Sequence, residues 1–190
     1  HAGVVAASAG NHALGLAYHG HLLDVPVTVV MPRWAPIVKV SNCRALDANV
    51  VLHGETYDEA KQHALKLAED KSLTYIPGFD DPDIIAGQGT MGLEILRQVP
   101  DVDAIVCPVG GGGLIAGLSV AVKALRPRVK IIGVESVCTG NFAAAKHAGR
   151  PVIVPRRPTL ADGLATLTVG VNSFALARSR VDQVVEVSED

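Results

Sequence analysis

The chain has 190 residues, of which 48% are hydrophobic and 19% are charged, and its formal net charge is −2. A chain of this length and composition can bury a core and is typical of a soluble globular protein. The small net charge gives no support for a nucleic-acid partner or for an anionic membrane surface.

Two further features of the composition favour a cytoplasmic protein. Cys43, Cys107 and Cys138 lie far apart in apolar surroundings, which favours reduced thiols over a disulfide framework or a zinc site. The apolar run from Ile105 to Val122 is interrupted by a proline and several glycines. It therefore predicts a buried strand, turn and helix instead of a membrane span.

The first part of the chain alternates short apolar segments with helical ones. Strands are predicted at residues 4–7, 26–31, 49–52 and 73–76, and helices at residues 13–22, 37–47 and 57–70. This alternation predicts a parallel sheet with helices on its faces.

The loop Ser8–His12 follows the first predicted strand and precedes the first predicted helix. Backbone N–H groups at the start of a helix can bind an anion, and Ser8 and Asn11 could add side-chain hydrogen bonds. A simple helix cap by Ser8 or Asn11 explains the same residues equally well. Taken alone, the loop leaves both interpretations open.

The segment Pro77–Pro82 is dense in turn residues and acids, and is the best candidate for a domain boundary. It is followed by helices predicted at 84–99, 114–125, 141–148 and 173–178, and by strands predicted at 104–107, 130–135 and 184–187. Glycines inside the first of these helices, Gly87 and Gly89, cost about 1 kcal/mol each relative to alanine. Close packing or a ligand should therefore justify them.

Four consecutive glycines, Gly110–Gly113, follow an apolar segment of the kind that forms a strand buried on both faces. At a strand-to-helix turn they allow successive N–H groups to converge at the positive end of a helix, where a phosphate binds well. The dinucleotide fingerprint does not fit, since Ile115 or Ala116 stands at its third glycine and the acidic ribose partner is missing. The nucleotide-triphosphate loop does not fit either, because its lysine is absent. A turn that merely packs closely is the alternative, but four glycines in a row favour anion binding.

Four motifs stand in the order and spacing found in pyridoxal-phosphate enzymes of the tryptophan-synthase-β type: Ser8–His12, Ala86–Thr90, Gly110–Leu114 and Leu160–Gly163. From about residue 4 to residue 190 the chain resembles threonine dehydratase, with serine racemase a near relative. The resemblance implies an α/β fold of two lobes, each with a mostly parallel sheet flanked by helices, incomplete here at both ends. Residues 1–79 would belong to the smaller lobe and residues 80–190 to the larger lobe, with a cleft between them.

The resemblance also implies a role for individual residues. Pyridoxal 5′-phosphate would be held through its phosphate by the glycine loop, through its 3′-oxygen by an asparagine, and against its ring by a further glycine. These cofactor-binding residues are Asn11, Gly110, Gly111, Gly112, Gly113, Leu114 and Gly163. The carboxylate of the substrate would be bound at the helix start, with an aromatic residue bordering the pocket. These substrate-binding residues are Ser8, Ala9, Gly10, His12 and Phe79.

The activity implied by the resemblance is deamination of L-threonine to 2-oxobutanoate, or of L-serine to pyruvate, with release of ammonia. The partner is thus a small hydroxy-amino acid, and the parent enzyme is expected to be a cytoplasmic homo-oligomer. The Schiff-base lysine of the family lies upstream of the Ser-Ala-Gly-Asn-His loop, in a Ser-x-Lys-x-Arg-Gly setting that no lysine of this chain has. No catalytic residue is therefore assigned, and we expect a fragment that is inactive by itself.

Two alternatives remain. A serine racemase would carry a second serine in place of Ala9, where its hydroxyl could protonate the face opposite the lysine, so Ala9 disfavours racemisation. The divalent-cation site of the racemase would fall at Glu135, Thr139 and Asn141, where asparagine removes one anionic ligand. We expect no metal there, with Glu135 the weak candidate. The other alternative is an inactive fragment that keeps the fold and binds only a phosphate or a partner.

Overall fold

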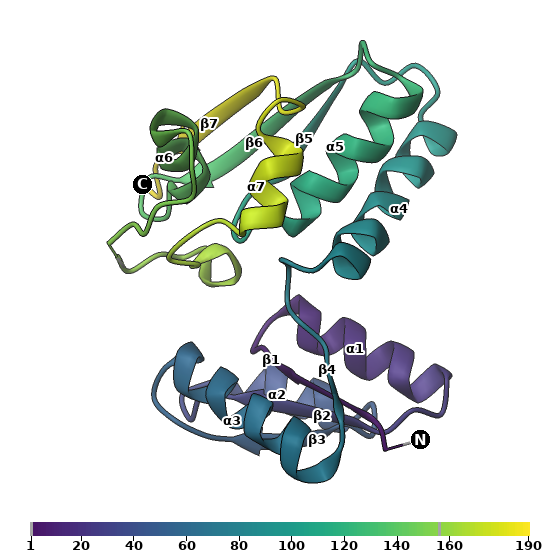
Figure 1. The fold of residues 1–190 in the computed structure, drawn as a ribbon, viewed down its shortest axis with the longest axis vertical. Helices are drawn as coiled ribbons and strands as arrows, with labels where there is room; N and C mark the ends of the chain where they lie inside the picture. The colour runs from purple at the N-terminus through teal and green to yellow at the C-terminus, as the bar shows by residue number, and fades with distance from the viewer. Residues whose placement is uncertain (1, 156) are drawn as a thin grey trace. The chain divides into compact units, whose positions relative to one another are not determined.

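The computed structural model describes residues 2–155 and 157–190 (Figure 1). The chain divides into two compact units, His1–Gly78 and Phe79–Asp190. No helix in the described part of the chain is both long enough and apolar enough to cross a membrane.

The first unit contains a parallel sheet whose strands run in the order β3-β2-β1-β4. Along the chain its elements are β1 (Val4–Ala7), α1 (Asn11–Leu22), β2 (Val27–Met31), α2 (Ile37–Arg44), β3 (Asn49–Leu52), α3 (Tyr57–Lys71) and β4 (Thr74–Tyr75). A helix follows each of the first three strands, which is the connection that parallel pairing requires. The parallel α/β architecture predicted for this region is confirmed.

Helices cover both faces of this sheet because successive side chains of a strand point to opposite faces. Val29 of β2 belongs to a core cluster with Ala13 and Ala17 of α1 and Val40 of α2. The next residue, Val30, belongs to a second cluster with Ala60 and Ala64 of α3 and with Val5 of β1. The small alanines let the helices approach the sheet closely.

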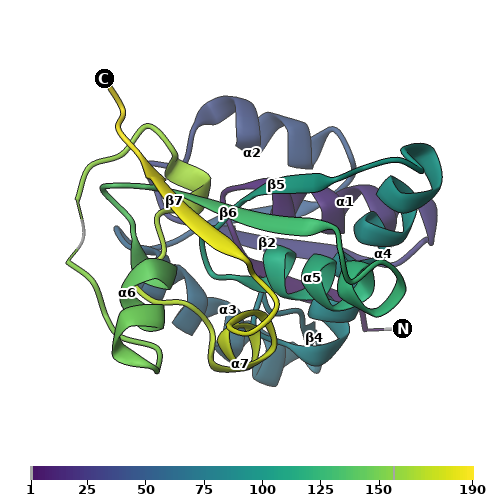
Figure 2. The ribbon, with the colours of Figure 1, turned by 90° about the horizontal axis from the view of Figure 1, so that it is seen from above.

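The second unit contains the parallel sheet β5-β6-β7, with β6 in the middle (Figure 2). Its elements are α4 (Pro82–Gln98), β5 (Ala104–Pro108), α5 (Gly113–Leu125), β6 (Lys130–Ser136), α6 (Asn141–Ala148), the 3-10 turn η1 (Asp162–Leu164), α7 (Val171–Ala177) and β7 (Gln183–Val187). Helix α5 lies between α4 and α7 (Figure 1). One core cluster joins these helices to α6 and to the sheet through residues such as Ile115, Ile131, Phe142 and Phe174.

One expectation for this sheet is wrong. The apolar segment before the glycines predicts a strand buried on both faces, but β5 alternates between buried and exposed residues. Ile105 and Cys107 are buried against the core, whereas Val106 is 64% exposed. Within the described residues, no element covers the face of β5 that carries Val106.

The close contact between α4 and α5 accounts for most of their glycines. A Cβ on Gly117 would lie 2.1 Å from the carbonyl oxygen of Ile85 and 2.6 Å from the amide nitrogen of Gly89. A Cβ on Gly89 would lie 3.1 Å from the carbonyl oxygen of Gly117. The predicted packing reason for Gly89 is therefore confirmed, whereas Gly87 is exposed and has no atom within 4 Å of its Cβ position.

The cysteines are free, as the sequence predicts, and Cys43 and Cys107 are buried. Burial raises the pKa of the Cys107 thiol to about 12, so that it stays protonated at neutral pH.

Candidate cofactor and substrate sites

The tetraglycine loop lies at the carboxyl edge of the second sheet, the edge at which parallel sheets bind ligands. It follows the carboxyl end of β5 and leads into α5, whose first residue is Gly113. Gly112 is the N-cap and has a φ of 91°. Only glycine adopts that left-handed conformation without strain, so the chain can turn abruptly from strand to helix.

Close packing on one side of the loop also leaves little room for side chains at Gly110, Gly111 and Gly113. A Cβ on Gly111 would lie 2.4 Å from the ring of Phe79, and one on Gly113 would lie 2.5 Å from the carbonyl oxygen of Phe79. A Cβ on Gly110 would lie 3.0 Å from the Cα of Leu164, next to the predicted ring-facing Gly163. Close packing, the alternative explanation for the glycines, is thus present in the structure.

The other side of the loop leaves backbone donors unpaired. Among the described residues, no acceptor receives a hydrogen bond from the amides of residues 110–115, and the first amide that does donate is that of Ala116, to Gly112 O at 3.0 Å. Residues 110–113 are buried. Buried amides without a partner are costly, and the dipole of α5 adds positive potential at the same point. These donors fit the phosphate of pyridoxal phosphate.

In the first unit, the segment Ser8–Gly10 connects β1 to α1 at the corresponding edge of its own sheet. Helix α1 begins at Asn11, two residues earlier than predicted, with Gly10 as its N-cap. The suggested cap by Ser8 or Asn11 is wrong, because no side chain caps the helix. The Ser8 hydroxyl instead accepts a hydrogen bond from the Gly10 amide at 3.1 Å.

The start of α1 therefore also presents unpaired amides. In the described part of the chain, no acceptor is found for the amides of Ala9, Asn11, His12 and Ala13. An anion such as a carboxylate matches these donors and the positive end of the helix.

His12 lies in the first turn of α1, not in the loop as predicted, and its ring is held in one orientation. Its Nε2 lies 3.2 Å from the carbonyl oxygen of Ile76. Because a carbonyl can only accept, Nε2 carries the proton. Burial lowers the pKa of His12, and the bond to Ile76 opposes this shift in part. In the neutral ring Nδ1 is therefore an acceptor.

Glu135, the weak candidate for a metal ligand, has a different set of partners. Its carboxylate is fully buried and accepts hydrogen bonds from the amides of Phe142 and Ala143, each at 2.8 Å, at the start of α6. Burial raises the pKa of Glu135, and the two amide bonds oppose this shift. Asn141 donates to Thr166, while its Oδ1 is buried and has no partner among residues 2–155 and 157–190. No group of three or more His, Cys, Asp or Glu residues in the described part of the chain could hold a metal ion.

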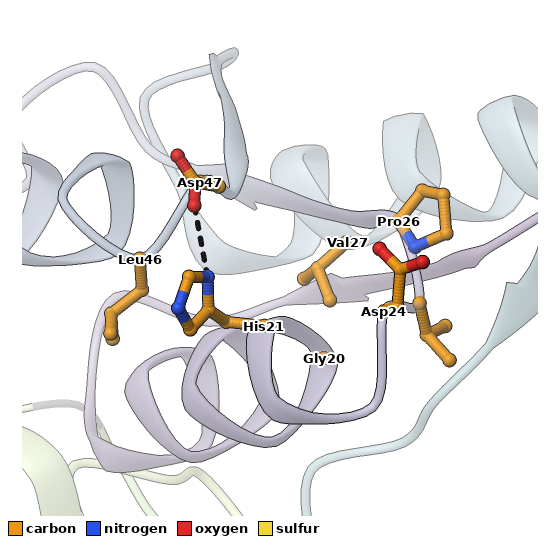
Figure 3. Close-up of a pocket in the computed structure, with 8 residues that line it drawn as sticks. Gly20, His21, Asp24, Pro26, Val27, Leu46 and Asp47 are labelled. Atoms are coloured by element: carbon orange, nitrogen blue, oxygen red, sulfur yellow. Dashed lines mark ion pairs between the residues drawn. The ribbon is translucent and has the colours of Figure 1, made fainter.

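A hollow of about 160 Å³ lies elsewhere in the first unit (Figure 3). It is bordered by Gly20, His21, Asp24 and Asp47, and His21 Nδ1 lies 2.9 Å from Asp47 Oδ2. The hollow includes the residues at which β2 begins. Ligands of parallel sheets bind at the opposite, carboxyl edge, where the loop after β1 lies.

The family of pyridoxal-phosphate dependent enzymes matches residues 1–190, the whole chain. The chain belongs to this family. It is 47% identical to an L-threonine ammonia-lyase of Thermotoga maritima over 99% of its own length and 47% of that protein. Among its relatives the chain spans between 31% and 47% of their length. Pyridoxal phosphate is the cofactor of the family.

Solved structures give the same fold. The processed form of threonine deaminase isoform 2 from Solanum lycopersicum superposes with a TM-score of 0.92 at 46% identity, over 98% of this chain and 55% of that chain. The structure of maize serine racemase superposes with a TM-score of 0.95 at 34% identity, over 99% of this chain and 57% of that chain. The predicted α/β fold with helix-flanked parallel sheets is thus shown.

Asp80 and Ser173 are conspicuous residues that the sequence analysis missed. The Asp80 carboxylate accepts three hydrogen bonds at the start of α7, from Val171 and Ser173. The pair Asp80-Asp81 before Pro82 was a usable signal, because one aspartate suffices to cap α4 and Asp81 does so. The partner of the other aspartate lies more than 90 residues away along the chain and leaves no local pattern.

Proposed function

We propose that the full-length parent of this chain is a pyridoxal-phosphate-dependent ammonia-lyase that converts L-threonine to 2-oxobutanoate, and L-serine to pyruvate, with release of ammonia. The names of its relatives support the reaction, and the unpaired amides of residues 110–115 are the observation that supports cofactor binding by this chain. On the resemblance alone, we extend the proposal to a cytoplasmic homo-oligomer. The two units would be parts of the two lobes of such an enzyme.

In this proposal the loop Gly110–Leu114 binds the phosphate of the cofactor. Several N–H groups share one dianion, so each donates a charge-assisted hydrogen bond that is stronger than a bond to a neutral acceptor. Phe79, which packs against Gly111 and Gly113, borders the substrate. Gly163 would face the cofactor ring. Apart from Gly163 and its chain neighbours, no described residue has an atom within 4 Å of the Cβ position, so the backbone there is open to a flat group.

The start of α1 binds the substrate carboxylate through the amides of Ala9, Asn11 and His12, with Ser8 and Gly10 shaping the turn. The Asn11 side chain is exposed, and it would donate to the 3′-oxygen of the cofactor. Neutral His12 adds no second positive charge, and its Nδ1 can accept a hydrogen bond from a bound group. These residues orient the Cα–H bond and the β-hydroxyl group of the substrate.

Pyridoxal phosphate, when bound, supplies the electron sink that accepts the electron pair of the broken Cα–H bond. The described residues position the substrate so that this bond is cleaved and the β-hydroxyl departs.

None of the lysines in this chain is proposed as the residue that holds the cofactor covalently. Lys123 donates to Pro127 O and pairs with Asp182, with Nζ 2.8 Å from Asp182 Oδ2. Lys146 donates to Val181 O at 3.2 Å. Lys123 lies in the last turn of α5 and Lys146 in the last turn of α6, so neither adjoins the tetraglycine loop in sequence. No other lysine adjoins any of the binding motifs.

The direct test is the product formed by the full-length protein, meaning the parent enzyme that contains this chain. Loaded with pyridoxal phosphate and given L-threonine, it should release 2-oxobutanoate and ammonia in equal amounts, as measured by liquid chromatography and an ammonia assay. The control is free pyridoxal phosphate at the same concentration. A rate no greater than that of the control would overturn the proposal.

A second prediction separates this function from that of a serine racemase. Replacing Ala9 with Ser supplies a hydroxyl that can carry a proton, and general acid–base groups contribute about 10²- to 10⁴-fold to a rate. We expect A9S to convert L-serine to D-serine at least ~10-fold faster than the unaltered protein does. Chiral chromatography measures the product, and A9G, which changes size without adding a donor, is the matched control. Equally fast D-serine formation by the unaltered protein would contradict this prediction and favour the racemase alternative.

A further inference from the structure

Asp80 ties two distant segments of the second unit together. Its Oδ2 accepts from the amide of Val171 at 2.9 Å, and its Oδ1 accepts from the amide and the hydroxyl of Ser173 at 2.9 and 3.1 Å. Ser173 is fully buried. A Cβ on Gly170 would lie 2.3 Å from the Asp80 carboxyl carbon, so this close approach requires glycine.

The end of α7 that Asp80 caps is in direct contact with the tetraglycine loop. The amide of Gly170 donates to Gly111 O at 2.9 Å. A Cβ on Gly112 would lie 2.7 Å from Val169 and 3.1 Å from the Cβ of Ser173. On its other side the loop packs against Phe79, the residue before Asp80. The loop is therefore held by two segments that Asp80 joins.

We propose that Asp80 is a positioning residue for phosphate binding. By fixing the start of α7 to the segment 79–80, it holds the tetraglycine loop in the shape in which the amides of residues 110–115 converge. This inference rests on the proposed phosphate role of that loop. Asp80 acts through Gly111 and Gly112 and need not touch the ligand.

The charge of Asp80 and its positioning role should change the affinity for phosphate in opposite directions. Asp80 is acidic and adjoins a loop that would bind an anion, so removal of its charge alone should strengthen phosphate binding. Loss of positioning has the opposite effect, because amides that no longer converge make fewer hydrogen bonds to the same group. The direction of the change in affinity therefore separates the two roles.

The experiment compares pyridoxal phosphate with pyridoxal, which lacks the phosphate, in titrations of the full-length apoprotein. For D80A we expect pyridoxal phosphate to bind at least ~10-fold more weakly, a loss of about 1.4 kcal/mol, while pyridoxal binding changes little. D80N removes the charge but keeps one acceptor oxygen, so it should lose less affinity than D80A. A change in global stability would lower the affinities for both ligands by a similar factor. Loss of a positioning role would change the ratio of the two affinities.

The matched control is D81A. It removes the same charge from the adjacent position and a cap from α4, since Asp81 Oδ1 accepts from the Asp83 amide at 2.9 Å. We expect it to lower stability and to leave the ratio of the two affinities unchanged. If D80A does not fold, S173A, which removes the hydroxyl that can donate to Asp80 Oδ1 or to Phe79 O and keeps the amide bond to Asp80, should still show a smaller shift of the ratio in the same direction.

The outcomes distinguish the proposal from the function on which it rests. If the unaltered protein prefers pyridoxal phosphate and D80A, or S173A in its place, keeps or increases that preference, the role of Asp80 is overturned and the phosphate role stands. If the unaltered protein shows no preference for the phosphorylated ligand, the phosphate role of the loop is overturned and the positioning role falls with it.

Discussion

Replacing Gly117 with Ala is expected to destabilise the second unit by about 3 kcal/mol or more, the upper end of the cost of overpacking a core. The new methyl group would lie 2.1 Å from Ile85 O and 2.6 Å from Gly89 N. Both atoms belong to the backbone of α4, so no side chain can rotate to make room. Denaturant unfolding of the full-length protein, followed by circular dichroism, measures the loss.

The matched control is Gly87→Ala, in the middle of α4. Gly87 is exposed, and no atom lies within 4 Å of its Cβ position. Alanine favours a helix over glycine by about 1 kcal/mol, so this variant should be slightly more stable than the unaltered protein. Equal effects of the two substitutions would contradict the close approach of α4 and α5.

Replacing Gly112 with Ala is expected to weaken the binding of pyridoxal phosphate by roughly 100-fold, the equivalent of losing one or two hydrogen bonds to a charged group. A residue with a side chain is strained at a φ of 91°, and the added carbon would lie 2.7 Å from Val169. The loop must move, so its amides no longer point toward the same phosphate position and make fewer hydrogen bonds to it. Calorimetric titration of the full-length apoprotein measures the affinity.

Gly149→Ala is the control for backbone strain. Gly149 ends α6 with a φ of 71°, and no atom lies within 4 Å of its Cβ position. The substitution should cost stability for the same conformational reason but should not change the affinity for the cofactor. A weaker binding of similar size in this variant would show that general loosening of the unit, not the shape of the loop, controls the affinity.

The sequence predicts most of the fold because the order of strands and helices follows from local patterns of apolar and polar residues. Short apolar strands separated by helices require parallel pairing, and both sheets have it. The prediction fails for β5, since a run such as Ala104–Cys107 does not reveal whether an element covers each face. It is also two residues late for α1, because Gly10 caps the helix without a side-chain signal.

In the candidate site, too, the sequence predicts local features but not the contacts between residues far apart in the chain. The sequence predicts loops at helix starts for Gly110–Gly113 and Ser8–His12 because glycine and cap residues leave a local signature. Both segments lie at helix starts, but the helices begin within them, at Gly113 and Asn11. The contact of Phe79 with Gly111 and the bonds of Asp80 to α7 join residues far apart in the chain, so no local pattern reports them. The roles given to these residues in binding remain predictions, as does the assignment of the two units to the lobes of the enzyme.

The parallel pairing of β1 with β4 has a consequence for the order of folding. These strands are about 70 residues apart, so the edge pairing of the first sheet waits for closure of a long loop, which slows folding relative to local hairpins. All strands of that sheet nevertheless precede residue 78, whereas the second sheet needs β7, which ends at Val187. Because chains emerge from the ribosome from the N-terminus at about 5–20 residues per second, the first sheet can close several seconds before the second is complete.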